Sequence, residues 1–189
     1  MTLDEIHNLI FVLENNKYKN KPAVTKLLVY FVKFTLSTGA RASSIINIKH
    51  SNIDLKTQTV QIIDTKNKSW YTTYINFKIF SSEDYLFIDS FRNGDYIFWN
   101  KGRKSIHRIV GYHMRPIYNE MFNEGLEADN AKHRVCNHTL RHTFASHLAI
   151  NQVPLFEIKK LMNHLDINMT LRYVKLSEAN KVSDVEGIY

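Results

Sequence analysis

A histidine and an arginine lie three residues apart in a segment whose apolar residues follow a helical period. Leu140 and Phe144 are four residues apart and mark the face expected to be buried, while His138 and Arg141 share another face. An imidazole and a guanidinium that converge on one spot are suited to binding a phosphate group. A helix that only packs against its neighbours could also carry this pair, so the pair by itself leaves both interpretations open.

Three further groups of residues with chemical potential lie elsewhere along the chain. His164 precedes Tyr173 by nine residues, and Arg41 directly follows the segment Thr38-Gly39-Ala40. Lys66 lies in a polar stretch between two segments rich in β-branched and aromatic residues, which predicts the turn of a hairpin. Together the groups supply a phenol, histidines, two arginines and a lysine, a set that can act on a phosphodiester.

In their order along the chain, the four groups resemble the conserved motifs of the tyrosine recombinase (phage integrase) family. The box that ends at Arg41 is similar to the family's Thr-Gly-x-Arg box, and Lys66 matches its β-hairpin lysine. The segment from His138 to His147 is similar to the second conserved box, and the block with His164 and Tyr173 is similar to the nucleophile segment. The resemblance covers essentially the whole chain and implies one catalytic domain over residues 1–189.

The resemblance implies that Tyr173 is the nucleophile, which forms a covalent bond to DNA. With a pKa of about 10, a phenol is about a thousandfold from ionised at neutral pH, so forming the free phenolate costs roughly 4 kcal/mol. His138 matches the histidine that serves the family as general base, and the near-neutral pKa of imidazole suits proton transfer in both directions.

The other residues of the set would act on the phosphate and the leaving group. Attack on a phosphodiester gathers negative charge on the non-bridging oxygens, which guanidinium groups match with paired hydrogen bonds. The resemblance assigns Arg41 and Arg141 to this task, with His164 as a further donor. Lys66 would protonate the 5′ leaving oxygen from the hairpin tip, and Lys68 is the alternative.

No metal or cofactor is expected, because the two arginines take the place of the cations of a two-metal nuclease. His138 and His142 are four residues apart and His147 is near, a spacing that would also be compatible with zinc. The segment lacks the glutamate of a His-Glu-x-x-His helix, and the chain has no cysteine cluster, so a zinc site is not predicted. His142 and His147 are expected to be structural.

The apolar pattern predicts a mainly α fold with a small antiparallel β-sheet (α+β), which agrees with the tyrosine recombinase catalytic-domain fold. A capping box at Thr2 and Glu5 predicts the start of the first helix, and a second helix is expected from Pro22 to the stop at Thr38-Gly39. Two strands and a possible third are expected at 59–64, 70–77 and 96–99, and further helices at 43–48, 105–123, 138–150, 154–163 and 167–176.

The charge of the chain favours a polyanionic partner. The 25 Lys and Arg against 18 Asp and Glu leave a formal net charge of +7, which is compatible with such a partner but does not identify it. The family resemblance implies that the partner is double-stranded DNA. Cys136, the single cysteine, is expected to be a small apolar filler in a reducing compartment. No apolar run approaches a membrane span, so a cytoplasmic protein without a membrane contact is expected. Basic residues expected to contact the DNA backbone are Lys68, Lys101, Arg103, Lys104 and Arg108.

Two positions depart from the pattern of the family. The family usually has Glu or Asp three residues after the first arginine, where this chain has Ser44, and a glycine before the last histidine, where it has Asn163. Asparagine tolerates a left-handed backbone better than most residues, so Asn163 is expected to replace the glycine. The N-terminal core-binding domain of full-length relatives is expected to be absent from this chain.

The sequence is compatible with three functions. The first is a site-specific recombinase or integrase that cleaves and rejoins DNA through a 3′-phosphotyrosine, with self-association into a tetramer on recombining sites. The second is a type IB topoisomerase-like enzyme that relaxes supercoils by the same chemistry, and the third is a catalytically silent DNA-binding remnant. The complete set of motif residues argues against the remnant, and the style of the motifs is that of integrases.

Overall fold

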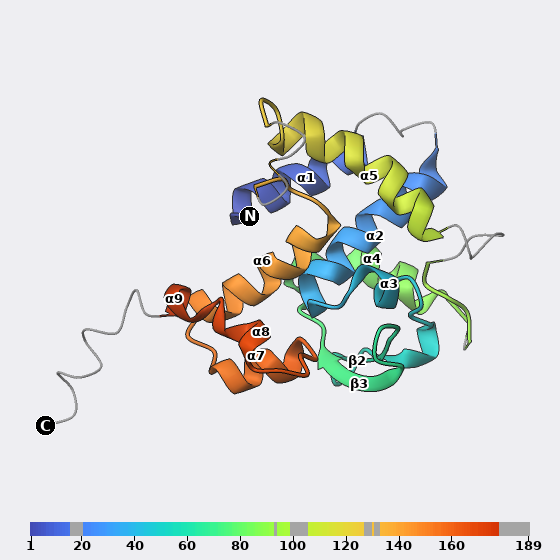
Figure 1. Ribbon diagram of the computed structural model, residues 1–189. Coiled ribbons are helices and arrows are strands. Elements are labelled where there is room, and N and C mark those ends of the chain that lie inside the picture. Colours follow the sequence, from blue (N-terminus) through green and yellow to red (C-terminus); the bar gives the residue numbers. More distant parts are fainter. Residues whose placement is uncertain (16–20, 93, 99–105, 127–129, 131–132, 178–189) are drawn as a thin grey trace, which may run out of the picture.

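Helix α2 (Pro22–Thr38) runs through the middle of the molecule, with other helices around it (Figure 1). Every residue from Leu28 to Thr38 is buried, which requires an apolar sequence and a partner for each polar group. The hydroxyls of Thr35 and Thr38 donate to backbone carbonyls of the preceding turn. This helix is therefore the scaffold on which the other helices pack.

Three longer helices pack against α2, namely α1 (Leu3–Asn15), α5 (Ile106–Phe122) and α6 (Asn137–Ile150). At the start of α1, Thr2 N–H donates to the Glu5 carboxylate and Glu5 N–H donates to the Thr2 hydroxyl, which confirms the predicted capping box. The computed structural model describes residues 1–15, 21–92, 94–98, 106–126, 130 and 133–177. None of the helices in these ranges is both long and apolar enough to cross a membrane.

The end of α2 positions the first arginine of the predicted set. Gly39 has a φ of 65°, and its N–H donates to the Thr35 carbonyl at 3.0 Å, so the helix ends in a left-handed residue. A Cβ at this position would lie 2.2 Å from Cδ1 of the Phe144 ring. Glycine satisfies both constraints, and Arg41 follows two residues later as the N-cap of α3 (Ala42–Ile45).

The sheet is antiparallel, with strand order β1-β2-β3. Strand β2 (Thr59–Asp64) pairs with β3 (Ser69–Tyr74) from Thr59 opposite Tyr74 to Asp64 opposite Ser69, which confirms the predicted hairpin. The third strand is β1 (Ile53–Asp54), on the other edge of β2. Since Val60 and Ile62 of β2 are buried while Trp70 of β3 is exposed, one face of the hairpin lies against the helices.

The prediction of a short strand at 96–99 is wrong. Tyr96 makes a single antiparallel bridge with Lys49, and Trp99 lies outside the described residues. The apolar residues Ile97 and Phe98 are buried in the core instead of extending the sheet. A short apolar run thus has more than one way to become buried, and here core packing takes the place of strand pairing.

The remaining elements are short and differ in part from the prediction. The single helix expected at 167–176 is divided into α8 (Asn168–Leu171) and α9 (Val174–Ser177), with Tyr173 between them. Helix α4 (Ser82–Asp89) was not predicted, although Ser81 and Asp84 form a capping box at its start. The other elements are η1 (His50–Asn52), η2 (Phe77–Ile79) and α7 (Leu155–Leu161).

Cys136 is exposed, so its interpretation as an apolar filler is wrong. It occupies the N-cap position of α6, where its backbone N–H donates to the Thr139 hydroxyl at 3.0 Å. The first turn of a helix leaves such N–H groups without partners and close to solvent, which is why an N-cap residue is seldom part of the core.

Candidate active site

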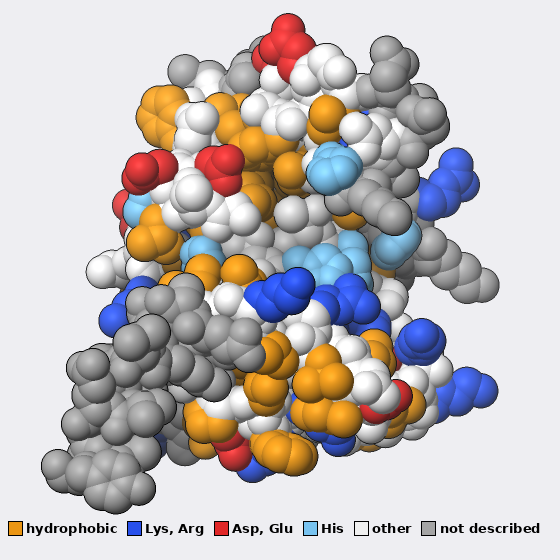
Figure 2. All heavy atoms as spheres, turned by 60° about the vertical axis from the view of Figure 1, so that its left-hand side comes forward, with side chains coloured by type: hydrophobic (Ala, Val, Ile, Leu, Met, Phe, Trp, Pro, Cys, Tyr) orange, Lys and Arg blue, Asp and Glu red, His pale blue; other side chains and the backbone are white. Residues whose placement is uncertain are grey.

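One small pocket, of about 180 Å³, brings together all six residues that the sequence predicts to be catalytic. The six come from the loop after α2, the hairpin turn, α6, and the chain around α8. Figure 2 shows histidine and basic side chains gathered next to one another in the middle of one face of the molecule. The pocket is lined by Arg41, Lys66, His138, Arg141, His142, His164, Met169, Arg172 and Tyr173.

Arg141 is fixed by two separate segments of backbone. Its side chain is buried, with a relative exposure of 3%, and its Nη1 and Nη2 atoms donate to the carbonyls of Gly39 and Met162, both at 2.7 Å. Burial, followed by the nearby Arg41 guanidinium, lowers the pKa of Arg141 to about 10. Arg141 therefore remains a cation at neutral pH, with a fixed orientation toward the pocket.

Arg41 and the hairpin turn reach the same pocket from another side. Arg41 Nη1 lies 2.5 Å from the Asp64 carboxylate at the end of β2, so the arginine is held against the sheet. Lys66 lines the pocket, whereas Lys68 is not among its lining residues. Lys68 has a φ of 52°, which marks the point where the hairpin turns back toward β3. Of the two turn lysines, Lys66 is thus the one that lines the pocket.

The Tyr173 hydroxyl contacts His142, a residue that the sequence interpretation left as structural. Its Oη lies 2.6 Å from His142 Nδ1, and the ring is buried with 4% exposure against the small cluster of Ala145, Ala149 and Met162. Burial raises the pKa of the Tyr173 phenol, and the guanidinium of Arg172 partly opposes this increase. Ionisation of Tyr173 at neutral pH therefore requires a proton acceptor beside it.

His138 lies beside His142 and not against the tyrosine. The two imidazole rings meet edge to face with their centroids 4.5 Å apart. Burial, and then the charges of the neighbouring arginines, lowers the pKa of His138. Burial and the neighbouring His138 and arginines likewise lower the pKa of His142 to about 4, so both rings are neutral at physiological pH and able to accept a proton. His147 lies away from them and contacts the Met1 carbonyl at 2.9 Å.

His164 is placed by the residues on both sides of it. Its Nδ1 lies 2.8 Å from the Thr170 hydroxyl in α8, and burial together with the nearby Arg141 lowers its pKa to about 4. Asn163 has a φ of 47°, which confirms that asparagine takes the left-handed conformation expected where the family has glycine. This conformation turns the chain at the end of α7 so that His164 enters the pocket.

Two pocket residues besides His142 were not predicted from the sequence. Arg172 and Met169 line the pocket with the others, and Arg172 adds a fourth cationic side chain to it. Arg172 directly precedes Tyr173, and this position next to the expected nucleophile is the signal in the sequence from which its place in the pocket could have been predicted. Among the expected DNA-backbone contacts, Arg108 lies on α5 beside a separate hollow with Tyr112 and His113. Lys101, Arg103 and Lys104 lie outside the described residues.

The sequence model of the phage integrase family matches residues 1–180. The chain belongs to the phage integrase family. A probable integrase/recombinase of Acholeplasma phage L2 is 25% identical over 179 residues, which are 93% of this chain and 57% of the relative. The tyrosine recombinase XerC of Staphylococcus epidermidis is 28% identical over 167 residues, which are 85% of this chain and 52% of that protein. The chain thus spans little more than half the length of these curated integrase-family relatives.

Solved structures give the same fold. The catalytic domain of bacteriophage HP1 integrase superposes with a TM-score of 0.61 and 23% identity, and the match covers 100% of this chain and 94% of that one. XerH recombinase bound to a palindromic difH substrate superposes with a TM-score of 0.66 and 16% identity, covering 100% of this chain and 52% of that one. The mainly α fold with its small antiparallel sheet is therefore that of tyrosine recombinase catalytic domains.

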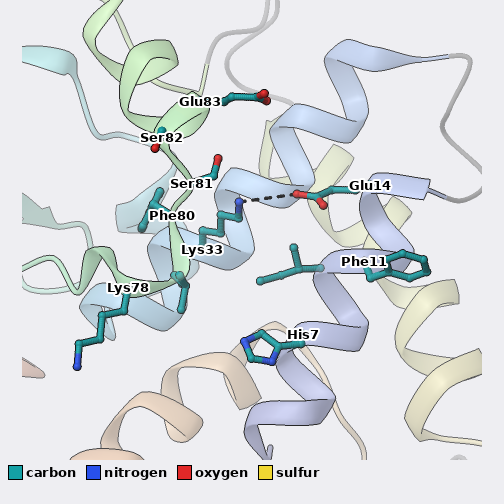
Figure 3. Close-up of a pocket in the computed structure, with 11 residues that line it drawn as sticks. His7, Phe11, Glu14, Lys33, Lys78, Phe80, Ser81, Ser82 and Glu83 are labelled. Carbon is teal, nitrogen blue, oxygen red and sulfur yellow. Dashed lines mark ion pairs between the residues drawn. The ribbon is translucent and has the colours of Figure 1, made fainter.

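A larger cavity, of about 820 Å³, lies away from the pocket that holds Tyr173, between α1, α2 and α4 (Figure 3). Its buried Lys33 donates to Asp84 at 2.6 Å and faces Glu14 at 3.7 Å, so the charge of the lysine is neutralised within the protein. None of the residues predicted to be catalytic lines this cavity. Among the described residues, no three His, Cys, Asp or Glu side chains are grouped so that they could hold a metal ion.

His142, which is half-buried, and His164, which is buried, should make the fold sensitive to acid. His142 and His164 have pKa values of about 4 in the folded protein, against an ordinary value of 6.5. Between these values the unfolded chain binds more protons, so stability falls as the pH falls through this range. From about pH 7 to pH 5 the free energy of unfolding should decrease by roughly 1–2 kcal/mol for each histidine.

Urea unfolding followed by circular dichroism at several pH values measures this dependence. His164→Gln removes one of the two titrating groups, so its free energy of unfolding should change less between pH 7 and pH 5 than that of the wild type. Equal slopes for the two proteins would show that His164 is not held neutral in the fold.

Proposed function

We propose that this domain cleaves and rejoins double-stranded DNA by transesterification, with Tyr173 as the nucleophile and a 3′-phosphotyrosine as the intermediate. One observation carries the proposal: the pocket is lined by Tyr173 together with three histidines, three arginines and a hairpin lysine. The family assignment supports the same chemistry. We place the reaction in site-specific recombination, because the relatives are named integrases and recombinases.

The cleavage step exchanges one phosphoester bond for another. The Tyr173 oxygen attacks the scissile phosphorus, a new bond from phosphorus to Oη forms, and the bond from phosphorus to the 5′ oxygen breaks. The phenolic proton leaves to the pair of touching imidazoles, in which His142 contacts the hydroxyl and His138 lies beside it. Lys66 gives a proton to the departing 5′ oxygen, so no free alkoxide forms.

The cations of the pocket act on the charge that accumulates during this exchange. The non-bridging oxygens gain negative charge as the phosphorus becomes pentacoordinate, and Arg41, Arg141 and His164 line the space in which they would lie. Arg141 is already held by two backbone carbonyls, so little reorganisation is needed when the phosphate enters. Preorganised donors of this kind are typically worth about 3–4 kcal/mol of the activation barrier each.

Rejoining is the reverse of cleavage. A 5′ hydroxyl attacks the phosphotyrosine, takes the place of the Tyr173 oxygen and restores the phosphodiester, so the energy of the bond is conserved and no nucleotide cofactor is consumed. Double-stranded DNA is the proposed partner, in agreement with the net charge of +7 and with the DNA-bound state of the XerH neighbour. We further propose self-association as a tetramer on recombining sites and a cytoplasmic location.

Trapping the covalent intermediate tests the proposal. The probe is a pool of nicked duplexes with a randomised central sequence, in which a short 5′ fragment diffuses away after cleavage and prevents rejoining. A band that survives denaturing gel electrophoresis and forms equally in EDTA is the expected result, and sequencing the captured strands would give the target. Absence of any adduct across the pool at high protein concentration would overturn the proposed activity.

A further inference from the structure

Asp64 is a fully buried carboxylate that touches three different parts of the pocket. It ends β2, its exposure is 0%, and its two oxygens accept hydrogen bonds from three segments of the chain. The donors to Oδ2 are Arg41 Nη1 at 2.5 Å, Asn163 Nδ2 at 3.0 Å and Asn67 Nδ2 at 3.1 Å, and the donors to Oδ1 are Lys66 N at 3.0 Å and Asn67 N at 3.3 Å.

Ser44, three residues after Arg41, does not share this task. Its side chain is buried, but its Oγ has no hydrogen-bond partner among the described residues. The carboxylate that the family usually has at this position is therefore missing from α3. In its place a carboxylate arrives from the sheet, and it reaches Arg41 across 23 residues of sequence.

We infer that Asp64 is a positioning residue for the proposed reaction, because it holds the Arg41 guanidinium in place while it links the lysine turn to the segment that carries His164. The inference rests on the proposed function and adds a residue to it. A guanidinium beside Arg141, Lys66 and Arg172 is repelled by three cations when no phosphate is bound. The Asp64 carboxylate offsets this repulsion through its contact with Nη1 and leaves the other N–H groups of Arg41 for a phosphate.

Replacement of Asp64 by asparagine should act selectively on Arg41. The carbonyl oxygen of the new amide can still accept from the two backbone N–H groups of the turn. Its NH₂ group then takes the place of Oδ2 and faces the three side-chain donors. The amides of Asn67 and Asn163 can rotate to present an oxygen. A guanidinium has no acceptor, so Arg41 loses its partner and its fixed orientation.

Asp54 provides a matched control. It stands at the end of β1, as Asp64 stands at the end of β2, and its carboxylate accepts the backbone N–H groups of Lys56 at 2.9 Å and Thr57 at 3.1 Å. Asp54 is exposed and has no arginine partner among the described contacts. Asp54→Asn therefore changes the same kind of turn without touching the pocket, and it should leave adduct formation unchanged.

The experiment measures the rate of adduct formation. Its substrates are three forms of a nicked duplex whose sequence the wild-type protein captured from the randomised pool. They carry an ordinary phosphodiester, a methylphosphonate, or a 5′-bridging phosphorothiolate at the scissile position. Asp64→Asn should slow the reaction on the phosphodiester by roughly 10- to 100-fold. The defect should shrink on the neutral methylphosphonate, which needs less guanidinium charge, and persist on the phosphorothiolate, whose thiolate leaves without a proton. Lys66→Ala serves as a reference, because its defect should persist on the methylphosphonate and shrink on the phosphorothiolate.

Three results would overturn the inference. They are a wild-type rate in Asp64→Asn, an equal defect on all three substrates, which indicates a general structural role, and rescue by the phosphorothiolate, which indicates an effect through Lys66. The side-chain ¹⁵N–¹H resonance of Arg41 gives a readout that needs no catalysis, and it should move in Asp64→Asn but not in Asp54→Asn. If the wild type forms no adduct, the proposed function fails, while this resonance still decides whether Asp64 holds Arg41.

Discussion

Tyr173→Phe is expected to abolish the covalent protein–DNA adduct completely while leaving the protein folded. The substitution removes the oxygen that would bond to phosphorus, and no residual rate through this position is possible. The aromatic ring stays in its buried place against Ala145, Ala149 and Met162. The cost to stability should be about 1 kcal/mol, the usual value of one hydrogen bond, here the one to His142. Denaturing gels of protein mixed with the nicked duplex measure the adduct.

Tyr118→Phe is the matched control for this experiment. Tyr118 is buried to the same degree, with 3% exposure, and its hydroxyl donates to Asn137 at 3.0 Å. Its substitution also removes one buried hydroxyl and one hydrogen bond. Tyr118 lines an adjoining hollow with His138 and Arg141 but does not line the pocket that holds Tyr173, so the adduct should form as in the wild type. An adduct that persists in Tyr173→Phe would assign the nucleophile to another residue.

The order of the motifs predicted which residues lie close together, because each motif fixes a local structure, such as a helix end or a hairpin turn, that determines where its functional residue lies. The Thr38-Gly39 stop is one example: the left-handed glycine ends α2, and its carbonyl then binds Arg141 from a helix a hundred residues later. The hairpin is another, since alternation and turn residues alone placed Lys66 at its tip. The fold class could therefore be predicted from local signals, and the six expected pocket residues from the resemblance of the ordered motifs to those of the family.

The contacts between distant segments could not be predicted in this way. His142 follows Arg141 directly, and helical periodicity cannot show that Tyr173, 31 residues later, places its hydroxyl against that ring. Asp64 is one of 18 acidic residues, and its role depends on the tertiary approach of Arg41 and Asn163. The helix expected at 167–176 is likewise divided between α8 and α9, and the buried Tyr173 lies between the two.

Arg141→Lys is expected to have the second-largest effect, because the same side chain serves both the fold and the pocket. The guanidinium donates through two nitrogens to the carbonyls of Gly39 and Met162, which lie at the ends of different helices. A lysine has a single nitrogen and cannot reach both carbonyls and a phosphate at once. Leaving one buried carbonyl without a partner should cost roughly 1–3 kcal/mol, which lowers the melting temperature by roughly 2–12 °C.

The effect on catalysis should exceed the effect on stability. Adduct formation should slow by about 10²- to 10³-fold, the loss expected when one preorganised donor to the developing charge is removed. Measurement at a temperature well below both melting transitions separates this loss from unfolding. Arg134→Lys is the matched control, since Arg134 also donates through two nitrogens, to the Leu126 carbonyl and the Asn119 side chain, both at 2.8 Å. Arg134 does not line the pocket that holds Tyr173.

The comparison of the two lysine variants decides between two roles for Arg141. If Arg141 only joins the ends of α2 and α7, both variants should lose stability and neither should lose rate once folded. If Arg141 also binds the phosphate, as proposed, only Arg141→Lys should lose rate, and a neutral methylphosphonate should recover part of it because less negative charge then develops. A folded Arg141→Lys protein that reacts at the wild-type rate would leave Arg41 and Arg172 as the guanidiniums that act on the phosphate.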